Sequence, residues 1–212
     1  MKFETLQYQF KNRPFFETPE VIALFDQTER QVLPRISRWV RQGKLIQLRR
    51  GKYLLPSRYQ NRPAHPYYIS NYLYRPSFIS LYTALQHYQS IPEEVAAVQG
   101  VATRQTAIWD TELGRFQYFS TTPDRFFGYS KIILGDGEQQ SALIADPERA
   151  LIDVCYFSTG EWTMSRWSEI RLQNCESIKI ERLIEYTEKM KCQKLERSIR
   201  QLIVLLNQRD KL

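Results

Sequence analysis

The stretch from Thr28 to Pro56 reads TERQVLPRISRWVRQGKLIQLRRGKYLLP. Its first half places apolar residues at helical spacing on one side and arginines on the other. Gly43 is expected to end the helix, because glycine adopts the left-handed conformation that often closes helices. Two short apolar runs flank Arg50-Gly51, where glycine permits the turn of a hairpin. The stretch therefore predicts a helix followed by a basic β-hairpin.

The helix expected over residues 28–42 has two chemically different faces. The face that a core would bury carries Val32, Leu33, Ile36, Trp39 and Val40, so Trp39 is expected to be a core residue. The other side is mostly basic or amide, with Arg30, Gln31, Arg35, Arg38, Arg41 and Gln42.

Pro34 lies inside this helix. An interior proline removes a backbone hydrogen bond and clashes with the preceding turn. Two outcomes are open: a kinked helix, or a separate turn over residues 28–33 with the main helix starting near Leu33 and Pro34 at its first position. We expect a bent or split element.

Two shorter helices are expected before this one. Residues 2–12 carry apolar side chains on one helical face. Thr18-Pro19-Glu20 is typical of a helix start, with a capping oxygen, a proline at the first helical position and an acid in the first turn. Thr28 is expected to cap the third helix. Three helices followed by a β-hairpin form a winged helix-turn-helix domain, which we expect over residues 1–56.

The positive charge of the chain is concentrated at its beginning. Residues 1–62 hold 13 Lys and Arg against 5 Asp and Glu, a net charge of +8. Residues 63–212 hold 17 against 18, a net charge of −1, which together gives the +7 of the whole chain. A basic module beside a nearly neutral body indicates a polyanionic partner for the module.

The remainder of the chain predicts a second domain. Residues 57–66, SRYQNRPAHP, are polar, contain two prolines and are expected to be a linker. Over residues 67–212 the periodicity changes from helices to short strands and back to helices, which favours a mixed α/β domain with a small, mainly antiparallel sheet and C-terminal helices. The fold class expected for the whole chain is therefore α+β.

Double-stranded DNA is the partner that fits the basic module. The major groove accepts one α-helix, and arginine and glutamine read base edges. The hairpin cations would contact the phosphates or the minor groove. The expected DNA-binding residues are Thr28, Arg30, Gln31, Arg35, Arg38, Lys44, Arg49, Arg50 and Lys52. A winged helix that docks a protein instead remains an open alternative.

Other classes of function have less support in the sequence. No apolar run approaches the length of a membrane helix, and the N-terminus lacks the features of a signal peptide, so we expect a cytoplasmic protein. The two histidines and three widely spaced cysteines form no metal-binding pattern, and no Gly-rich phosphate loop is present. We expect no metal or other cofactor.

Catalysis is not expected either. A nuclease would need clustered carboxylates and a lysine, which the pairs Asp136/Glu138 and Asp146/Glu148 do not supply. The second pair is better explained as acids at a helix N-terminus. Asp153 is expected to pair with Arg149 across one helical turn.

Several segments resemble the AbiEi-type antitoxins of type IV toxin–antitoxin systems, which act in phage abortive infection. GKLIQLRRGKYLLP (43–56) is similar to the wing of that family, and RPSFISLYTALQHYQSIPE (75–93) to its proline–aromatic–serine helix entry. TELGRFQYFSTTPDRFFGY (111–129) resembles its hairpin, and IADPERALIDVCYF (144–157) its Pro-Glu-(Lys/Arg)-Ala-Leu-(Ile/Leu)-Asp helix. Pro34 departs from the family pattern within the helix that should read DNA.

The resemblance implies a transcriptional repressor and antitoxin with two domains. Its winged helix would bind inverted repeats in its own promoter. Its C-terminal domain would counteract a nucleotidyltransferase-like toxin encoded beside it, without requiring a stable complex with that toxin. A DNA-binding regulator unrelated to toxin neutralisation is the alternative.

Overall fold

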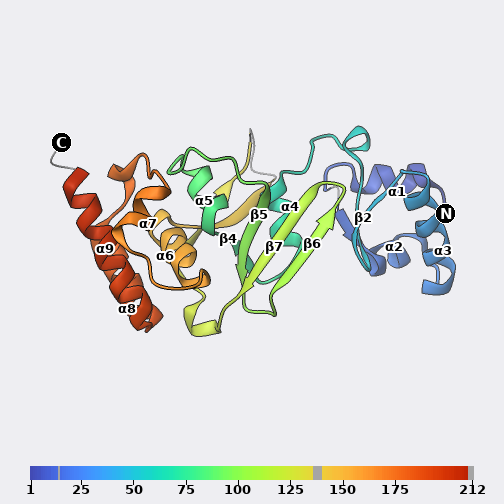
Figure 1. The fold of residues 1–212 in the computed structure, drawn as a ribbon. Coiled ribbons are helices and arrows are strands. Elements are labelled where there is room, and N and C mark those ends of the chain that lie inside the picture. Colours follow the sequence, from blue (N-terminus) through green and yellow to red (C-terminus); the bar gives the residue numbers. More distant parts are fainter. Residues whose placement is uncertain (14, 136–139, 210–212) are drawn as a thin grey trace. The chain divides into compact units, whose positions relative to one another are not determined.

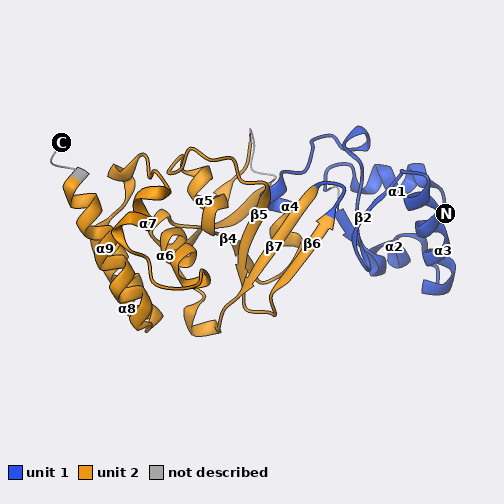
Figure 2. Cartoon of the chain, in the orientation of Figure 1, with its two compact units in different colours: residues 1–69, 111–113 blue, residues 70–110, 114–212 orange. Residues whose placement is uncertain are grey.

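A computed structural model describes residues 1–13, 15–135 and 140–209 and divides the chain into two compact units (Figures 1 and 2). The first unit comprises residues 1–69 and 111–113, and the second comprises residues 70–110 and 114–212. Residues 57–66, the expected linker, lie inside the first unit, where Ser57–Tyr59 form a 3-10 turn.

The first unit combines three helices with a three-stranded antiparallel sheet. The helices are α1 (Phe3–Phe10), α2 (Thr18–Phe25) and α3 (Glu29–Arg41), and the strands β1 (Phe15–Glu17), β2 (Ile46–Arg49) and β3 (Lys52–Leu54) pair in the order β1-β3-β2. One core joins them through Phe3, Leu6, Phe10, Phe16, Val21, Val32, Ile36, Trp39, Leu45, Tyr53 and Leu55. The expected burial of Trp39 is confirmed.

Helix α3 is continuous from Glu29 to Arg41, so of the two expected outcomes, a bent or a split element, the split one is wrong. Val32, Ile36 and Trp39 bury one side of the helix and hold both halves to the core. The expected burial of Leu33 is wrong: it is 38% exposed, because it lies at the edge of this face. Pro34 lies on the exposed side, where its ring displaces no core residue. Tertiary packing thus outweighs a local cost of about 3 kcal/mol relative to alanine.

The start of α2 also differs from the expectation. Glu17, and not Thr18, is the N-cap residue, because the Glu17 amide donates to Oε2 of Glu20 at 2.8 Å and Glu17 forms a capping box with Glu20. Thr18 is the first helical residue and is buried. Strand β1 was not predicted from the sequence. Its Phe15 and Phe16 pair with Leu54 and Tyr53 of β3.

The second unit is built on a six-stranded sheet in the order β6-β7-β5-β4-β9-β8 (Figure 1). Its strands are β4 (Ser77–Ile79), β5 (Ala97–Ala102), β6 (Ala107–Thr111), β7 (Gly114–Ser120), β8 (Tyr129–Ile133) and β9 (Ser141–Ala145). Strand β4 pairs antiparallel with β5, and β8 with β9, but β4–β9 and β5–β7 are parallel. With the β6–β7 hairpin, antiparallel neighbours thus predominate in the sheet, as expected, and the two parallel pairs are an addition that the sequence did not predict.

Helices make up the rest of the second unit. They are α4 (Pro66–Leu73, which begins in the first unit), α5 (Leu81–His87), α6 (Pro147–Phe157), α7 (Met164–Glu169), α8 (Ile180–Met190) and α9 (Gln193–Arg209). Helix α6 packs against α5, α8 and α9 (Figure 1), which confirms the expected C-terminal helices. None of the helices in the described part of the chain is long and apolar enough to span a membrane.

Candidate nucleic-acid interface

A basic stripe follows the outer side of α3. Arg30, Arg38 and Arg41 are exposed and recur at the spacing of one helical face, opposite to the buried Val32, Ile36 and Trp39. Within the described residues, the three guanidinium groups make no hydrogen bond or ion pair to the protein. We call Arg30, Pro34, Ser37, Arg38 and Arg41 the outer stripe of α3.

Three other expected contact residues have partners inside the protein. The backbone amide and the hydroxyl of Thr28 donate to Oε1 of Gln31, at 3.0 and 3.1 Å, so both residues cap the start of α3. Nη1 of Arg35 donates to the Met1 carbonyl at 2.7 Å. Thr28 and Gln31 thus hold the first turn of α3, and Arg35 holds the N-terminus of the chain to α3.

The turn between β2 and β3 holds the other group of expected cations. Arg50 is exposed, Arg49 is half-buried, and Gly51 has a φ of +77°, which permits the turn. The Gly51 carbonyl accepts a hydrogen bond from the Thr18 amide at 3.1 Å, which ties the turn to the start of α2.

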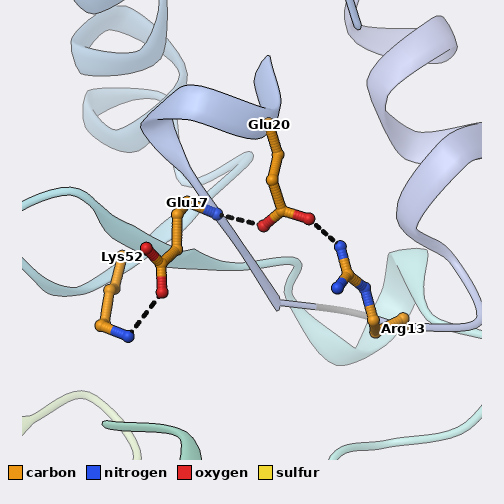
Figure 3. A network of polar contacts seen from close by, with 4 residues as sticks. All are labelled: Arg13, Glu17, Glu20 and Lys52. Carbon is orange, nitrogen blue, oxygen red and sulfur yellow. Dashed lines mark hydrogen bonds and ion pairs between the residues drawn. The ribbon is translucent and has the colours of Figure 1, made fainter. Parts of the chain in front are cut away.

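Lys52 does not extend freely from this turn. Its Nζ lies 2.6 Å from Oε1 of Glu17, and the Glu17 amide donates to Glu20, which also pairs with Arg13 (Figure 3). The network ties β3 to the start of α2, so the charge of Lys52 is already partly balanced.

Lys44 lies where α3 passes into β2. Its Nζ stands over the Phe3 ring, 5.2 Å from the ring centre, which ties it to α1. Arg58 donates to the carbonyl of Gly43 and stacks on Tyr59 at 4.8 Å. These cations support the end of α3 and add positive charge near it.

The structure thus sorts the expected contact residues into two groups. Arg30, Arg38 and Arg50 are exposed, with no protein partner in the described residues. The others are half-buried or make contacts within the unit: Thr28, Gln31, Arg35, Lys44, Arg49 and Lys52. Arg41 was placed on the outer face by its spacing but was not included among the expected contacts. Arg41 lies three residues after Arg38 on the same helical face, and this spacing indicates a DNA contact as much for Arg41 as for Arg38.

The carboxylates of the second unit have structural partners. Oε1 of Glu148 accepts from the Lys179 amide at 2.7 Å, and Oδ2 of Asp146 accepts from the Tyr186 hydroxyl at 2.9 Å. Burial, followed by the bond and charge of Asp146, raises the pKa of Tyr186 to about 12, so its hydroxyl remains a donor at neutral pH. Asp136 and Glu138 lie outside the described residues. No group of three or more potential metal ligands occurs among the residues that are described.

Three of the four segments that carry the family resemblance meet at one buried arginine. Arg149 is fully buried, and its guanidinium forms two contacts to Asp153, Nε to Oδ2 at 3.0 Å and Nη2 to Oδ1 at 2.9 Å, which confirms the expected pair. Ser80 donates to the same carboxylate at 2.6 Å. The Phe78 and Phe127 rings lie 5.6 and 4.7 Å from the guanidinium. Residues from the segments 75–93, 111–129 and 144–157 therefore form one structural cluster.

Comparison with known proteins gives no family for this chain. No protein-family model matches it, and no curated protein matches its sequence.

Proposed function

We propose that the first unit is a winged helix-turn-helix that binds double-stranded DNA, with α3 in the major groove and the β2–β3 turn beside it. The observation that carries the proposal is the outer stripe of α3, whose Arg30, Arg38 and Arg41 are exposed and without protein partners in the described residues. Exposed arginines on one helix face suit a groove that accepts a single helix. The order of three helices and a hairpin, with α2 and α3 separated by residues 26–28, supports the same interpretation.

The exposed cations divide into two roles in this proposal. Arg30 and Arg38 read base edges, because an arginine can donate two hydrogen bonds to one guanine. Arg41 and Arg50 contact phosphates and supply affinity that does not depend on sequence. Thr28 and Gln31 hold the first turn of α3, and Lys52 holds the hairpin to α2, so these three act by positioning.

Selection of duplexes from a random-sequence pool tests DNA binding directly. The wild-type chain should enrich a defined sequence, and affinity for it should fall steeply with salt. Replacing Arg30 or Arg38 with Ala should reduce binding to that sequence by roughly 1–3 kcal/mol, because each arginine would donate a bidentate pair of hydrogen bonds to a base. Arg50→Ala should weaken binding to every duplex and lower the salt slope by about one.

A matched control removes one arginine from the second unit. Arg197 is exposed and pairs with Glu161 at 2.7 Å, so Arg197→Ala removes the same formal charge from the second unit and leaves the first unit unchanged. This variant should leave both selectivity and salt slope unchanged. Failure of the wild-type chain to prefer any duplex would reject the proposal and would favour a winged helix that docks a protein.

We further propose that the chain is a repressor and antitoxin of the AbiEi type that acts in the cytoplasm, where its promoter lies, and that it has no catalytic activity. The resemblance of four segments supports this assignment, and three of them meet at the Arg149–Asp153 pair as parts of one framework. The carboxylates of Asp146 and Glu148 serve the packing of α6 and α8.

The antitoxin proposal has its own test. A nucleotidyltransferase-like gene should lie beside the gene for this chain, and expression of that enzyme alone should arrest growth. Co-expression of this chain should restore growth, including with Arg30 and Arg38 replaced by Ala, since neutralisation is assigned to the second unit. If growth is not restored and DNA binding persists, the chain is a regulator unrelated to toxin neutralisation.

A further inference from the structure

Packing in the core of the first unit does not account for a proline at position 34. It is exposed in the sixth position of α3, and its ring lies on the side away from the buried residues. A proline there has no N–H to donate to the Arg30 carbonyl one turn earlier, so most other residues would hold the helix better. Sequences break a local rule of this kind mainly at functional sites.

The surroundings of Pro34 suggest what the function is. Arg30 lies one turn before it on the outer stripe, and Arg38 and Arg41 follow it. Pro34 is thus the apolar element between arginines on the surface assigned to the major groove. In that groove the apolar group presented by a base edge is the C5-methyl of thymine, which apolar side chains recognise by contact.

We propose that Pro34 determines sequence specificity by packing its ring against the C5-methyl group of one thymine, while the flanking arginines contact neighbouring bases or phosphates. This inference rests on the proposed binding of α3 to DNA. Proline suits the task because its ring is rigid and loses no side-chain freedom when it is buried against a base. The helix remains continuous in spite of the missing hydrogen bond because its opposite face is held in the core.

The test uses the full chain and a duplex that the wild-type chain has selected from a random-sequence pool. Each thymine of that duplex is replaced in turn by deoxyuridine, which removes the methyl group and retains base pairing. At one position in each bound copy, the replacement should weaken wild-type binding about fourfold, as expected for one buried methyl group. At that position Pro34→Gln should bind the thymine and deoxyuridine duplexes with equal affinity. Pro34→Ala should show a difference in affinity smaller than that of the wild type.

Leu33→Gln is the matched control. Leu33 is 38% exposed and neighbours Pro34 but lies on the flank of α3, so the same change from an apolar residue to an amide should keep the methyl dependence. The salt slope of each variant shows whether the protein still docks on the phosphates, because the cations are unchanged.

The outcomes separate this inference from the proposed function. If the wild-type chain selects no duplex, both are rejected. If it selects a duplex but no deoxyuridine replacement matters, or if Pro34→Gln retains the full methyl dependence, only the role of Pro34 is rejected. Loss of the dependence in Leu33→Gln but not in Pro34→Gln would assign the contact to Leu33.

Discussion

Arg149 of α6 is fully buried and held by Asp153, whereas Arg30, Arg38 and Arg41 of α3 are exposed without a protein partner in the described residues. The prolines of the two helices differ in the same way. Pro147 is the first residue of α6, where its missing N–H costs nothing, and Pro34 lies inside α3, where it removes a hydrogen bond. In α6 the arginine and the proline both serve the fold, whereas in α3 the three exposed arginines and Pro34 do not.

This difference separates residues that hold the fold from residues available to a ligand. A buried guanidinium must have partners, because an unpaired buried charge is very costly, so Arg149 is committed to the protein. The exposed arginines of α3 contribute little to stability, and their common face matters only if something binds there. The comparison can be tested by changing each element in turn.

The largest effect on stability is expected from Arg149→Met. The change leaves the Asp153 carboxylate buried without its cation, which typically costs about 3–5 kcal/mol. Amide hydrogen exchange along α6, together with urea unfolding, would measure the loss. The double variant Arg149→Met/Asp153→Leu removes both charges and should recover most of the stability. A loss below about 1 kcal/mol in the single variant would show that Arg149 does not hold the second unit together.

The two prolines should respond in opposite directions to alanine. Pro34→Ala should stabilise the first unit, by at most about 3 kcal/mol, because it restores an N–H inside α3 and removes a clash. Pro147→Ala should cost less than about 1 kcal/mol, because proline already fits the first helical position. Thermal unfolding and hydrogen exchange of α3 and α6 measure both changes. A Pro34→Ala variant that is less stable than the wild type would mean that the ring has a packing role.

A smaller effect should distinguish close packing from backbone strain at two glycines. Gly128 and Gly135 have nearly the same conformation, with φ of +74° and +72°. A Cβ at Gly128 would lie 2.9 Å from Cε2 of Tyr186 and 3.1 Å from Arg149, whereas one at Gly135 would meet no atom of the described residues within 4 Å. Gly128→Ala should therefore destabilise by roughly 1–3 kcal/mol more than Gly135→Ala, measured by urea unfolding. Equal losses would show that the residues around Arg149 can move apart.

Local patterns predicted most elements of the first unit, because helix caps, proline and glycine positions and apolar spacing act over a few residues. They missed β1, since Phe15 and Phe16 form a strand only by pairing with β3, about forty residues later in the chain. They also could not show that β7 lies between β6 and β5, which makes the larger sheet mixed. Spacing alone placed Arg30 and Arg38 on the outer side of α3, but only the structure shows Arg35 bound to the Met1 carbonyl and Lys52 to Glu17.

The smallest effect on stability is expected at the end of α3. Arg41 is exposed and has no protein partner in the described residues, so Arg41→Ala should change the free energy of unfolding by less than about 0.5 kcal/mol. The same variant should lower the slope of log affinity against log salt by about 0.9, the value for one phosphate that is no longer neutralised. Arg197→Ala, the control in the second unit, should change neither quantity appreciably. A normal salt slope in Arg41→Ala would remove Arg41 from the interface, and a large loss of stability would place it with Arg149 among the residues that hold the fold.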